Sequence, residues 1–185
     1  MELITFIIPS IGRPTLERTI QSLQQLDDPY WKAIIVFDGI DATIKTSDER
    51  IKMIGVEKTG QINHAGMVRN YGISLATTEW IGFVDDDDTL KPEYITHLRQ
   101  HIKEDNPDIV IFRMLDKDKI LPPLCSEDFC LNEVGISFCL KRYIFSEQNY
   151  WFIPCGYEDY LLLHILRENG KKIIMSQHVN YIVRG

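Results

Sequence analysis

Four consecutive aspartates, Asp85 to Asp88, follow a short apolar run at residues 80–84. The length and content of that run are typical of a buried strand. Four like charges at the end of a buried strand repel one another, and a bound cation would neutralise them. Mg2+ and Mn2+ take oxygen ligands, and Mg2+ is often held by one or two carboxylates together with substrate phosphates. The stretch predicts a metal site, with a solvated acidic turn as the alternative because aspartate favours turns.

The composition is that of an ordinary soluble globular chain. Of its 185 residues, 44% are hydrophobic and 25% are charged, so we expect one domain with a single core. A formal net charge of -7 argues against a general nucleic-acid binder. No apolar run approaches the length of a membrane span, and the first residues carry no signal-peptide pattern. We expect a cytoplasmic protein, or a soluble domain on the cytosolic side of a membrane.

Apolar runs alternate with helical patterns along the first part of the chain. Strand-like runs stand at residues 3–8, 33–37, 51–54, 80–84 and 108–112. Helical spacing is present at 14–23, 65–75 and 92–103, with Thr89 as a cap for the third helix and a polar connection at 60–66. This alternation predicts a parallel, doubly wound α/β sheet. Ligands of such sheets bind beyond the carboxyl ends of the strands, where Pro9, Asp38 and Asp85 stand.

The second part of the chain is less regular. We expect an ordered loop region at 114–137, and the pattern at 137–145 fits either a strand or a helix. A leucine-rich helix follows at 157–169, and two short strands at 172–175 and 179–183 end the fold. The four cysteines match no common zinc spacing, so we expect reduced thiols.

Five short motifs stand in order along the chain, at 6–10, 36–39, 68–73, 83–90 and 158–160. They read Phe-Ile-Ile-Pro-Ser, Val-Phe-Asp-Gly, Val-Arg-Asn-Tyr-Gly-Ile, Phe-Val-Asp-Asp-Asp-Asp-Thr-Leu and Glu-Asp-Tyr. Together they resemble the nucleotide-sugar-dependent glycosyltransferases of the GT-A fold, most closely the inverting family 2. The resemblance runs from residue 3 to about residue 175 and implies a Rossmann-like, mixed but mostly parallel sheet flanked by helices.

The resemblance also implies how the chain is organised. One domain would span residues 1–185, with a nucleotide-sugar-binding half at 1–113 and an acceptor and catalytic-base half at 114–185. The donor would be a nucleoside-diphosphate sugar, commonly a UDP-sugar. The acceptor would be a hydroxyl compound such as a glycan, as in polysaccharide biosynthesis. The oligomeric state is left open.

The resemblance assigns donor-binding roles to residues at the strand ends. Pro9 and Ser10 match the place where the first strand of the family meets the nucleoside, and we count Arg13 in the following loop with them. Asp38 matches an aspartate that hydrogen-bonds the base, and a carboxylate accepts from a uracil ring N–H. Arg69 matches the arginine of the family's Ala-Arg-Asn motif and would help to hold the nucleotide.

The acidic run matches the family's Asp-any-Asp signature. Asp85 and Asp86 would approach the ribose, and Asp87 would coordinate Mn2+ or Mg2+ at the diphosphate. The cation would offset the charge that develops on the leaving diphosphate. Several members of the fold place a late histidine on the metal, which makes His178 a candidate ligand here, with a structural role as the alternative.

An inverting transfer needs one general base, which takes the proton of the acceptor hydroxyl as its oxygen attacks the anomeric carbon. The family's Glu-Asp pair matches here, and we assign the base to Asp159 with Glu158 as the alternative. Both would lie in the first turn of a helix, where the dipole favours ionised acids, although acids also cap such ends routinely. The nearby Trp151, Phe152 and Tyr157 would either stack on an acceptor sugar or pack under the loop.

The sequence departs from the family pattern at three places. Phe37 stands where many members carry a second aspartate, residues 10–13 lack the usual Tyr-Asn pair, and Val68 replaces the usual alanine. These departures leave the nucleobase and the sugar open.

Two other function classes remain at this point. A sugar-phosphate nucleotidyltransferase also uses a doubly wound sheet and Mg2+, but normally has a glycine-rich phosphate loop with a basic residue after its first strand. Only Gly12 and Arg13 stand there in this chain. The other class is a non-catalytic module that binds a nucleotide-sugar.

Overall fold

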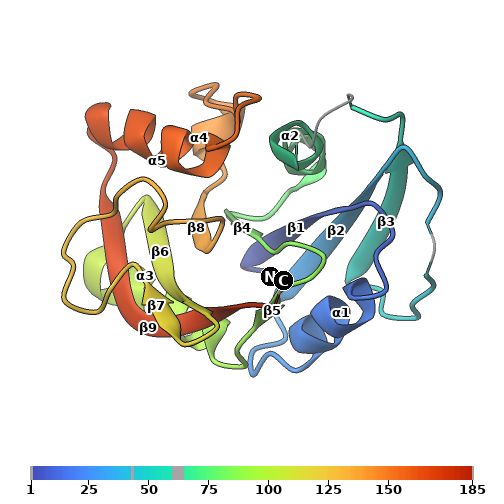
Figure 1. Cartoon of the computed structure of the whole chain (residues 1–185), viewed down its shortest axis with the longest axis horizontal. Coiled ribbons are helices and arrows are strands. Elements are labelled where there is room, and N and C mark those ends of the chain that lie inside the picture. Colours follow the sequence, from blue (N-terminus) through green and yellow to red (C-terminus); the bar gives the residue numbers. More distant parts are fainter. Residues whose placement is uncertain (1, 43, 60–64, 185) are drawn as a thin grey trace.

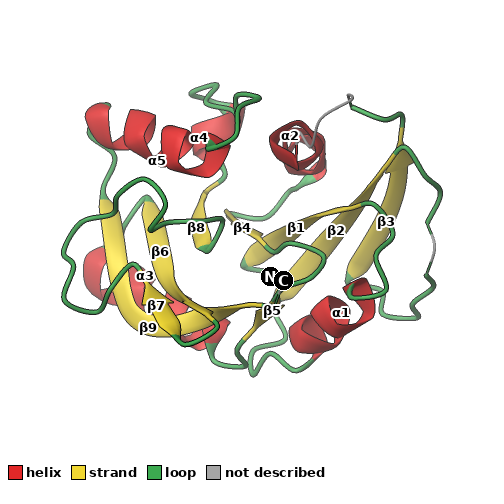
Figure 2. Cartoon of the chain, viewed as in Figure 1, coloured by secondary structure: helices red, strands yellow, loops and turns green. Residues whose placement is uncertain are grey.

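The computed structural model describes residues 2–42, 44–59 and 65–184, which form one mixed sheet with helices on both sides (Figures 1 and 2). Within these residues the strands are β1 (Ile4–Ser10), β2 (Trp31–Asp38), β3 (Ile51–Val56), β4 (Trp80–Phe83), β5 (Thr89–Leu90), β6 (Ile109–Asp116), β7 (Lys119–Leu121), β8 (Phe138–Lys141) and β9 (Ile173–Val183). The helices are α1 (Leu16–Gln24), α2 (Ala65–Leu75), α3 (Tyr94–Asp105), α4 (Tyr143–Ser146) and α5 (Glu158–Glu168). The strand order is β3-β2-β1-β4-β8-β6-β9-β5, with β7 paired to β6.

The N-terminal part of the sheet is parallel. β1 pairs with β2 and β4, and β2 pairs with β3. β1, β2 and β4 are largely buried because helices cover both sides of a parallel sheet, whereas the edge strand β3 is partly exposed. α2 lies close to β1, since a Cβ atom placed on Gly72 would lie 2.6 Å from Cγ2 of Ile7. The predicted parallel α/β arrangement is confirmed here, and the close approach brings the residues of α2 to the carboxyl ends of β1 and β4.

The C-terminal part mixes the strand directions. β8 is antiparallel to β4 and β6, whereas β9 runs parallel to β6. The undecided segment at 137–145 contains β8 and most of α4. The two short final strands form one long strand, β9, with register shifts opposite Arg113. The GT-A-like fold class that the sequence predicted is confirmed.

Thr89 is not a helix cap, as the sequence had suggested. Together with Leu90 it forms β5, which pairs with Ile182 and Tyr181 of β9, and α3 begins only at Tyr94. The partner strand lies more than 90 residues later in the chain, so the local pattern could not reveal it. The polar connection expected at 60–66 falls largely on residues 60–64, which lie outside the described residues.

A buried arginine orders the loop after β7. The side chain of Arg113 is fully buried, and its guanidinium donates to the backbone carbonyls of Pro122, Pro123 and Ser126. Burial lowers the pKa of Arg113 below its ordinary value, and the carbonyl oxygens accept hydrogen bonds from its two terminal nitrogens. The ordered loop expected within 114–137 is thus held from inside the sheet. Across the described residues, no helix combines the length and apolar character that crossing a membrane requires.

Candidate functional site

The acidic turn lies in a pocket where the strand ends meet. β4 ends at Phe83, and the turn at 85–88 follows beside the ends of β1 and β2. The pocket encloses about 200 Å3 and is lined by Pro9, Ser10, Ile11, Arg13, Asp38, Ala65, Val68, Asp85, Asp86 and Asp87. The structure therefore brings together all the residues predicted to bind the donor except Arg69, which contacts the pocket through Asp85.

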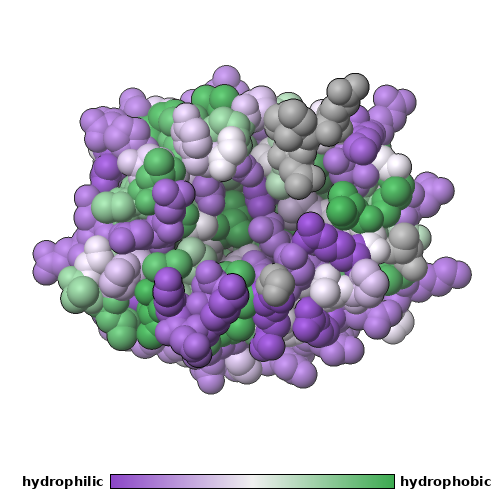
Figure 3. Space-filling view, viewed as in Figure 1, coloured by the Kyte–Doolittle hydropathy of each residue, from purple (hydrophilic) through white to green (hydrophobic). Residues whose placement is uncertain are grey.

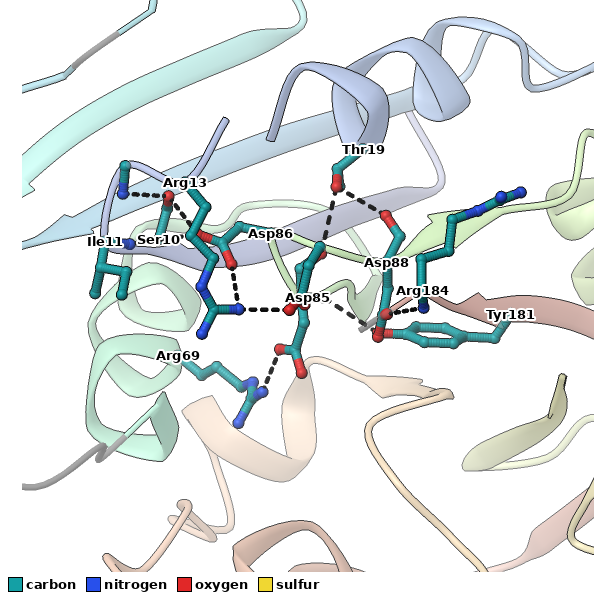
Figure 4. A network of polar contacts seen from close by, with 12 residues as sticks. Ser10, Ile11, Arg13, Thr19, Arg69, Asp85, Asp86, Asp88, Tyr181 and Arg184 are labelled. Carbon is teal, nitrogen blue, oxygen red and sulfur yellow. Dashed lines mark hydrogen bonds and ion pairs between the residues drawn. The ribbon is translucent and has the colours of Figure 1, made fainter. Parts of the chain in front are cut away.

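Asp86 forms the inner wall of this pocket. Its carboxylate accepts hydrogen bonds from Ser10 Oγ at 2.7 Å and from the backbone N–H of Ile11 at 3.4 Å, and it pairs with Arg13 at 3.2 Å (Figure 4). Burial raises the pKa of Asp86 above its ordinary value, although the Ser10 hydroxyl and Arg13 act in the opposite direction. Asp86 thereby ties the loop after β1 to the turn after β4.

Asp87 faces the more open part of the pocket. One of its oxygens lies 2.5 Å from the guanidinium of Arg13, whose side chain is 43% exposed. Among the described residues, no group of three or more His, Cys, Asp or Glu converges as a metal centre. The Asp87 carboxylate supplies the oxygen ligand that Mg2+ and Mn2+ prefer, and both ions commonly share such a ligand with substrate phosphates. This donor type fits a diphosphate-bound cation.

Asp38 reaches the pocket from the end of β2. Its Oδ1 accepts a hydrogen bond of 2.7 Å from the backbone N–H of Thr59. This bond orients the carboxylate and connects β2 with the segment that follows β3.

Arg69 connects the acidic turn to α5. From α2 its guanidinium donates to Asp85 at 2.5 Å and to Glu158 at 3.0 Å, and its side chain is only 4% exposed. Burial works to lower the pKa of Arg69, but the two carboxylates raise it above its ordinary value. The guanidinium therefore stays charged and joins three elements that lie far apart in the sequence.

The Glu158–Asp159 pair occupies the first turn of α5, as the sequence predicted. The two side chains have different surroundings. Glu158 contacts Arg69, whereas Asp159 lies half-buried beside Gly135 and accepts a hydrogen bond from the Tyr160 backbone N–H. Burial, assisted by the charge of Glu158, raises the pKa of Asp159 above its ordinary value. Among the ion pairs that the described residues form, Glu158 and not Asp159 contacts the donor-side Arg69.

His178 lies apart from the acidic turn. Its ring stacks on that of His97 in α3, with 3.5 Å between the ring centroids, and His101 lies at its edge. Burial lowers the pKa of His178, and the two neighbouring histidines add to this effect. The structure does not bring His178 to Asp87, because its side chain faces α3 and not the pocket; the packing of this ring matches the structural alternative.

The aromatic residues before α5 divide into buried and exposed ones. Phe152 is buried against Phe83, so it packs in the core, whereas Tyr157 is 50% exposed. Figure 3 shows hydrophobic side chains on the molecular surface over the region of α4 and α5. The backbone of Phe152 is held by the side-chain amide of Asn70, which donates to its carbonyl at 2.9 Å and accepts from its N–H at 3.0 Å.

Sequence reasoning missed Asn70 and Asp88 as organising residues, although both lie inside the quoted motifs. Asp88 is buried, and its carboxylate accepts hydrogen bonds from the Tyr181 hydroxyl and the Arg184 backbone N–H (Figure 4). Burial raises the pKa of Asp88 to about 6. The available signal was that an Asp-any-Asp signature explains only Asp85 to Asp87 and leaves the fourth aspartate unassigned.

Comparison with known proteins places this chain in a family. The chain matches the model of glycosyl transferase family 2 over residues 5–120. It is 29% identical over 154 residues to the glycosyltransferase GlyG of Streptococcus pneumoniae, covering 76% of this chain and 50% of that protein. It is 27% identical over 118 residues to the poly(ribitol-phosphate) beta-N-acetylglucosaminyltransferase TarP of Staphylococcus aureus, covering 60% of this chain and 36% of TarP. The chain thus spans half or less of the length of these relatives.

Solved structures agree on the fold. Staphylococcus aureus TarS 1-349, solved in complex with UDP-GlcNAc, superposes with a TM-score of 0.79 at 16% identity, over 99% of this chain and 58% of that one. The mannosyltransferase PcManGT from Pyrobaculum calidifontis was solved with GDP-Man and Mn2+. It superposes with a TM-score of 0.72 at 15% identity, over 98% of this chain and 56% of that one. The family match covers well over half of the sequence, and the chain belongs to glycosyl transferase family 2 and has the GT-A fold.

Proposed function

We propose that this chain transfers a sugar from a nucleoside-diphosphate sugar, with a UDP-sugar as the first candidate, to a hydroxyl of a glycan acceptor with inversion at the anomeric carbon. The observation that carries the proposal is the contact of Arg69 with both Asp85 and Glu158. It joins the candidate donor pocket to the candidate base pair, so that one site contains the groups that both substrates need. Family membership argues against the nucleotidyltransferase alternative.

The donor would lie along the ends of β1, β2 and β4. Pro9 and Ser10 would contact the nucleoside. Oδ1 of Asp38 accepts from Thr59, so Oδ2 would accept a hydrogen bond from an N–H of the base. Asp85 and Asp86 would approach the ribose. Arg69 and Arg13 supply positive charge beside the acidic turn, which favours a diphosphate between them. Solved neighbours of the same fold hold either UDP-GlcNAc or GDP-Man, which supports a nucleoside-diphosphate donor.

We infer that Asp87 holds Mn2+ or Mg2+ together with the diphosphate oxygens. When bound, the cation offsets the negative charge that grows on the leaving diphosphate. Arg13 would turn from Asp87 toward the phosphates as the donor arrives, because its exposed side chain now pairs with the carboxylate that the cation needs. We do not include His178 in this site.

The base would be Asp159, with Glu158 as the alternative. The base takes the proton of the acceptor hydroxyl, the acceptor oxygen bonds to the anomeric carbon, and the bond from that carbon to the diphosphate oxygen breaks on the opposite face. A raised pKa makes Asp159 a stronger base than an ordinary carboxylate, which favours this role at neutral pH. In this proposal residues 1–113 bind the donor, and residues 114–185 supply the base and the acceptor contacts.

A thermal-shift series tests the donor proposal most directly. UDP, UDP-GlcNAc and GDP-mannose are each added with Mn2+, with Mg2+ and with EDTA, since a ligand that binds the folded state raises the melting temperature. We expect the largest rise for a UDP compound with Mn2+. No rise for any nucleotide, with or without cation, would contradict the proposal. A bound donor that is never turned over by the full-length protein would favour the non-catalytic module.

A further inference from the structure

The fourth aspartate of the acidic run is bound to the last strand of the sheet. Asp88 is 6% exposed, and its Oδ2 accepts from the hydroxyl of Tyr181 at 2.8 Å. Its Oδ1 accepts from the backbone N–H of Arg184 at 2.9 Å. The same Tyr181 hydroxyl accepts from the backbone N–H of Asp85 at 3.1 Å. One buried phenol therefore contacts both ends of the acidic turn (Figure 4).

The turn is also held from its opposite side. Thr19 of α1 donates from its hydroxyl to the backbone carbonyl of Asp88 at 2.7 Å. The backbone N–H of Asp88 donates to the carbonyl of Asp85 at 3.1 Å, which closes the turn on itself. The backbone is thus bound at residues 85 and 88, and the side chains of Asp86 and Asp87 project from the segment between them.

A merely structural need does not explain this arrangement well. Taking a carboxylate out of water is unfavourable unless hydrogen bonds satisfy its oxygens. Apolar residues at both 88 and 181 would fill the same volume without that penalty. The hydrogen bonds formed here all end on, or begin from, the segment that carries the candidate metal and ribose contacts. The two groups are therefore placed to control the geometry of that segment.

We propose that Tyr181 and Asp88 are positioning residues for sugar transfer: they hold the turn at 85–88 so that Asp87 presents its carboxylate to the cation while Asp85 stays on Arg69. This inference rests on the proposed cation-dependent transfer. It gives the C-terminal strand β9 a part in the donor site, although β9 does not line the pocket. Outer-shell groups that orient a ligand change metal affinity by about 10- to 100-fold when removed.

The test is Tyr181→Phe, which keeps the buried ring and removes only the hydroxyl. The matched control is Tyr94→Phe, because Tyr94 is equally buried and its hydroxyl makes no hydrogen bond to the acidic turn. Mn2+ affinity is measured in the presence of UDP by electron paramagnetic resonance of the free ion, and the half-saturating Mn2+ concentration is measured in turnover. We expect the Kd for Mn2+ and the half-saturating Mn2+ concentration each to rise about tenfold in Tyr181→Phe. Both should stay at the wild-type value in Tyr94→Phe.

Two results separate failure of this inference from failure of the proposed function. If the wild-type protein binds Mn2+ with UDP and Tyr181→Phe binds it equally well at an equal folded fraction, the positioning role is overturned and the function stands. If the wild-type protein turns over its donor without any cation, the proposed metal dependence is overturned and this inference falls with it. Asp88→Asn is a second variant, and we expect its effect and that of Tyr181→Phe to be less than additive because both break one bridge.

Discussion

Arg69 and Glu158 stand 89 residues apart in the sequence and form an ion pair of 3.0 Å inside the protein. The other end of the same guanidinium holds Asp85 at 2.5 Å. One planar cation therefore sets the distance between the candidate donor site and the candidate base. Lysine has the charge of arginine but not its two-sided fork, so this geometry depends on the arginine itself.

We accordingly expect Arg69→Lys to keep the fold and to lower kcat/KM roughly 100-fold through misplacement of the two carboxylates. Arg69→Met should also destabilise the protein, by about 3 kcal/mol, because it leaves the carboxylates without their partner. Steady-state kinetics and urea unfolding measure the two effects. Arg50→Lys is the control, since Arg50 pairs with Asp48 on a partly exposed surface and such pairs contribute little. Full activity in Arg69→Lys would contradict the bridging role.

Asp87→Ala should remove the response to Mn2+. The expected loss in turnover is roughly 100-fold or more, because the charge on the leaving diphosphate is then no longer offset. Asp118→Ala serves as the control, because Asp118 is an exposed acid in the β6–β7 turn. A thermal shift by UDP that still depends on Mn2+ in Asp87→Ala would show that the cation binds elsewhere.

Asp159→Asn and Glu158→Gln decide which acid is the base. Loss of a general base lowers kcat by roughly 100- to 10,000-fold, while donor binding by thermal shift should persist. The pKa of Asp159 is raised, and the base must be unprotonated. Activity should therefore fall as the pH drops through a value above that of an ordinary aspartate. If Glu158→Gln removes this fall in activity at low pH and Asp159→Asn retains it, the general base is Glu158 and not Asp159.

Asp88 should make the folding free energy depend on pH in an unusual direction. Its pKa is about 6 in the folded protein against 3.8 for an ordinary aspartate, so the folded state binds the proton more tightly. The contribution of this group to the free energy of unfolding is complete below pH 3.8 and is lost as the pH rises through about 6. The total loss is roughly 3 kcal/mol, because each pKa unit corresponds to about 1.36 kcal/mol. Urea unfolding in EDTA should show this decline in the wild type. Asp88→Asn should lack it, and equal pH profiles would contradict the shift.

The sequence predicted the parts of the fold that local pattern controls. Strands such as β2 are buried on both faces and read as continuous apolar runs, and α5 has a clear leucine face. The pocket residues were also predictable, because strand ends of a parallel sheet meet at one edge. β5 was not predictable, since its two residues are a strand only through pairing with β9.

The same limit applies to the candidate site. The role of Asp88 depends on Tyr181, and the placement of His178 depends on His97 of α3. The local sequence pattern predicts neither contact, because the two partners in each pair lie far apart in the sequence. His178 matches the late position of a metal-binding histidine in several members of the fold. The direction of its side chain, however, is set by the face of β9 on which it lies.

The carbonyl cage around Arg113 has a consequence for which residues of the loop at 122–126 can change. In the loop at 122–126 the guanidinium contacts main-chain oxygens, and every amino acid supplies such an oxygen. New side chains can therefore replace the old ones along this loop while its path is retained. The shape of this loop is therefore set by a residue outside it, separately from the chemistry of its own surface.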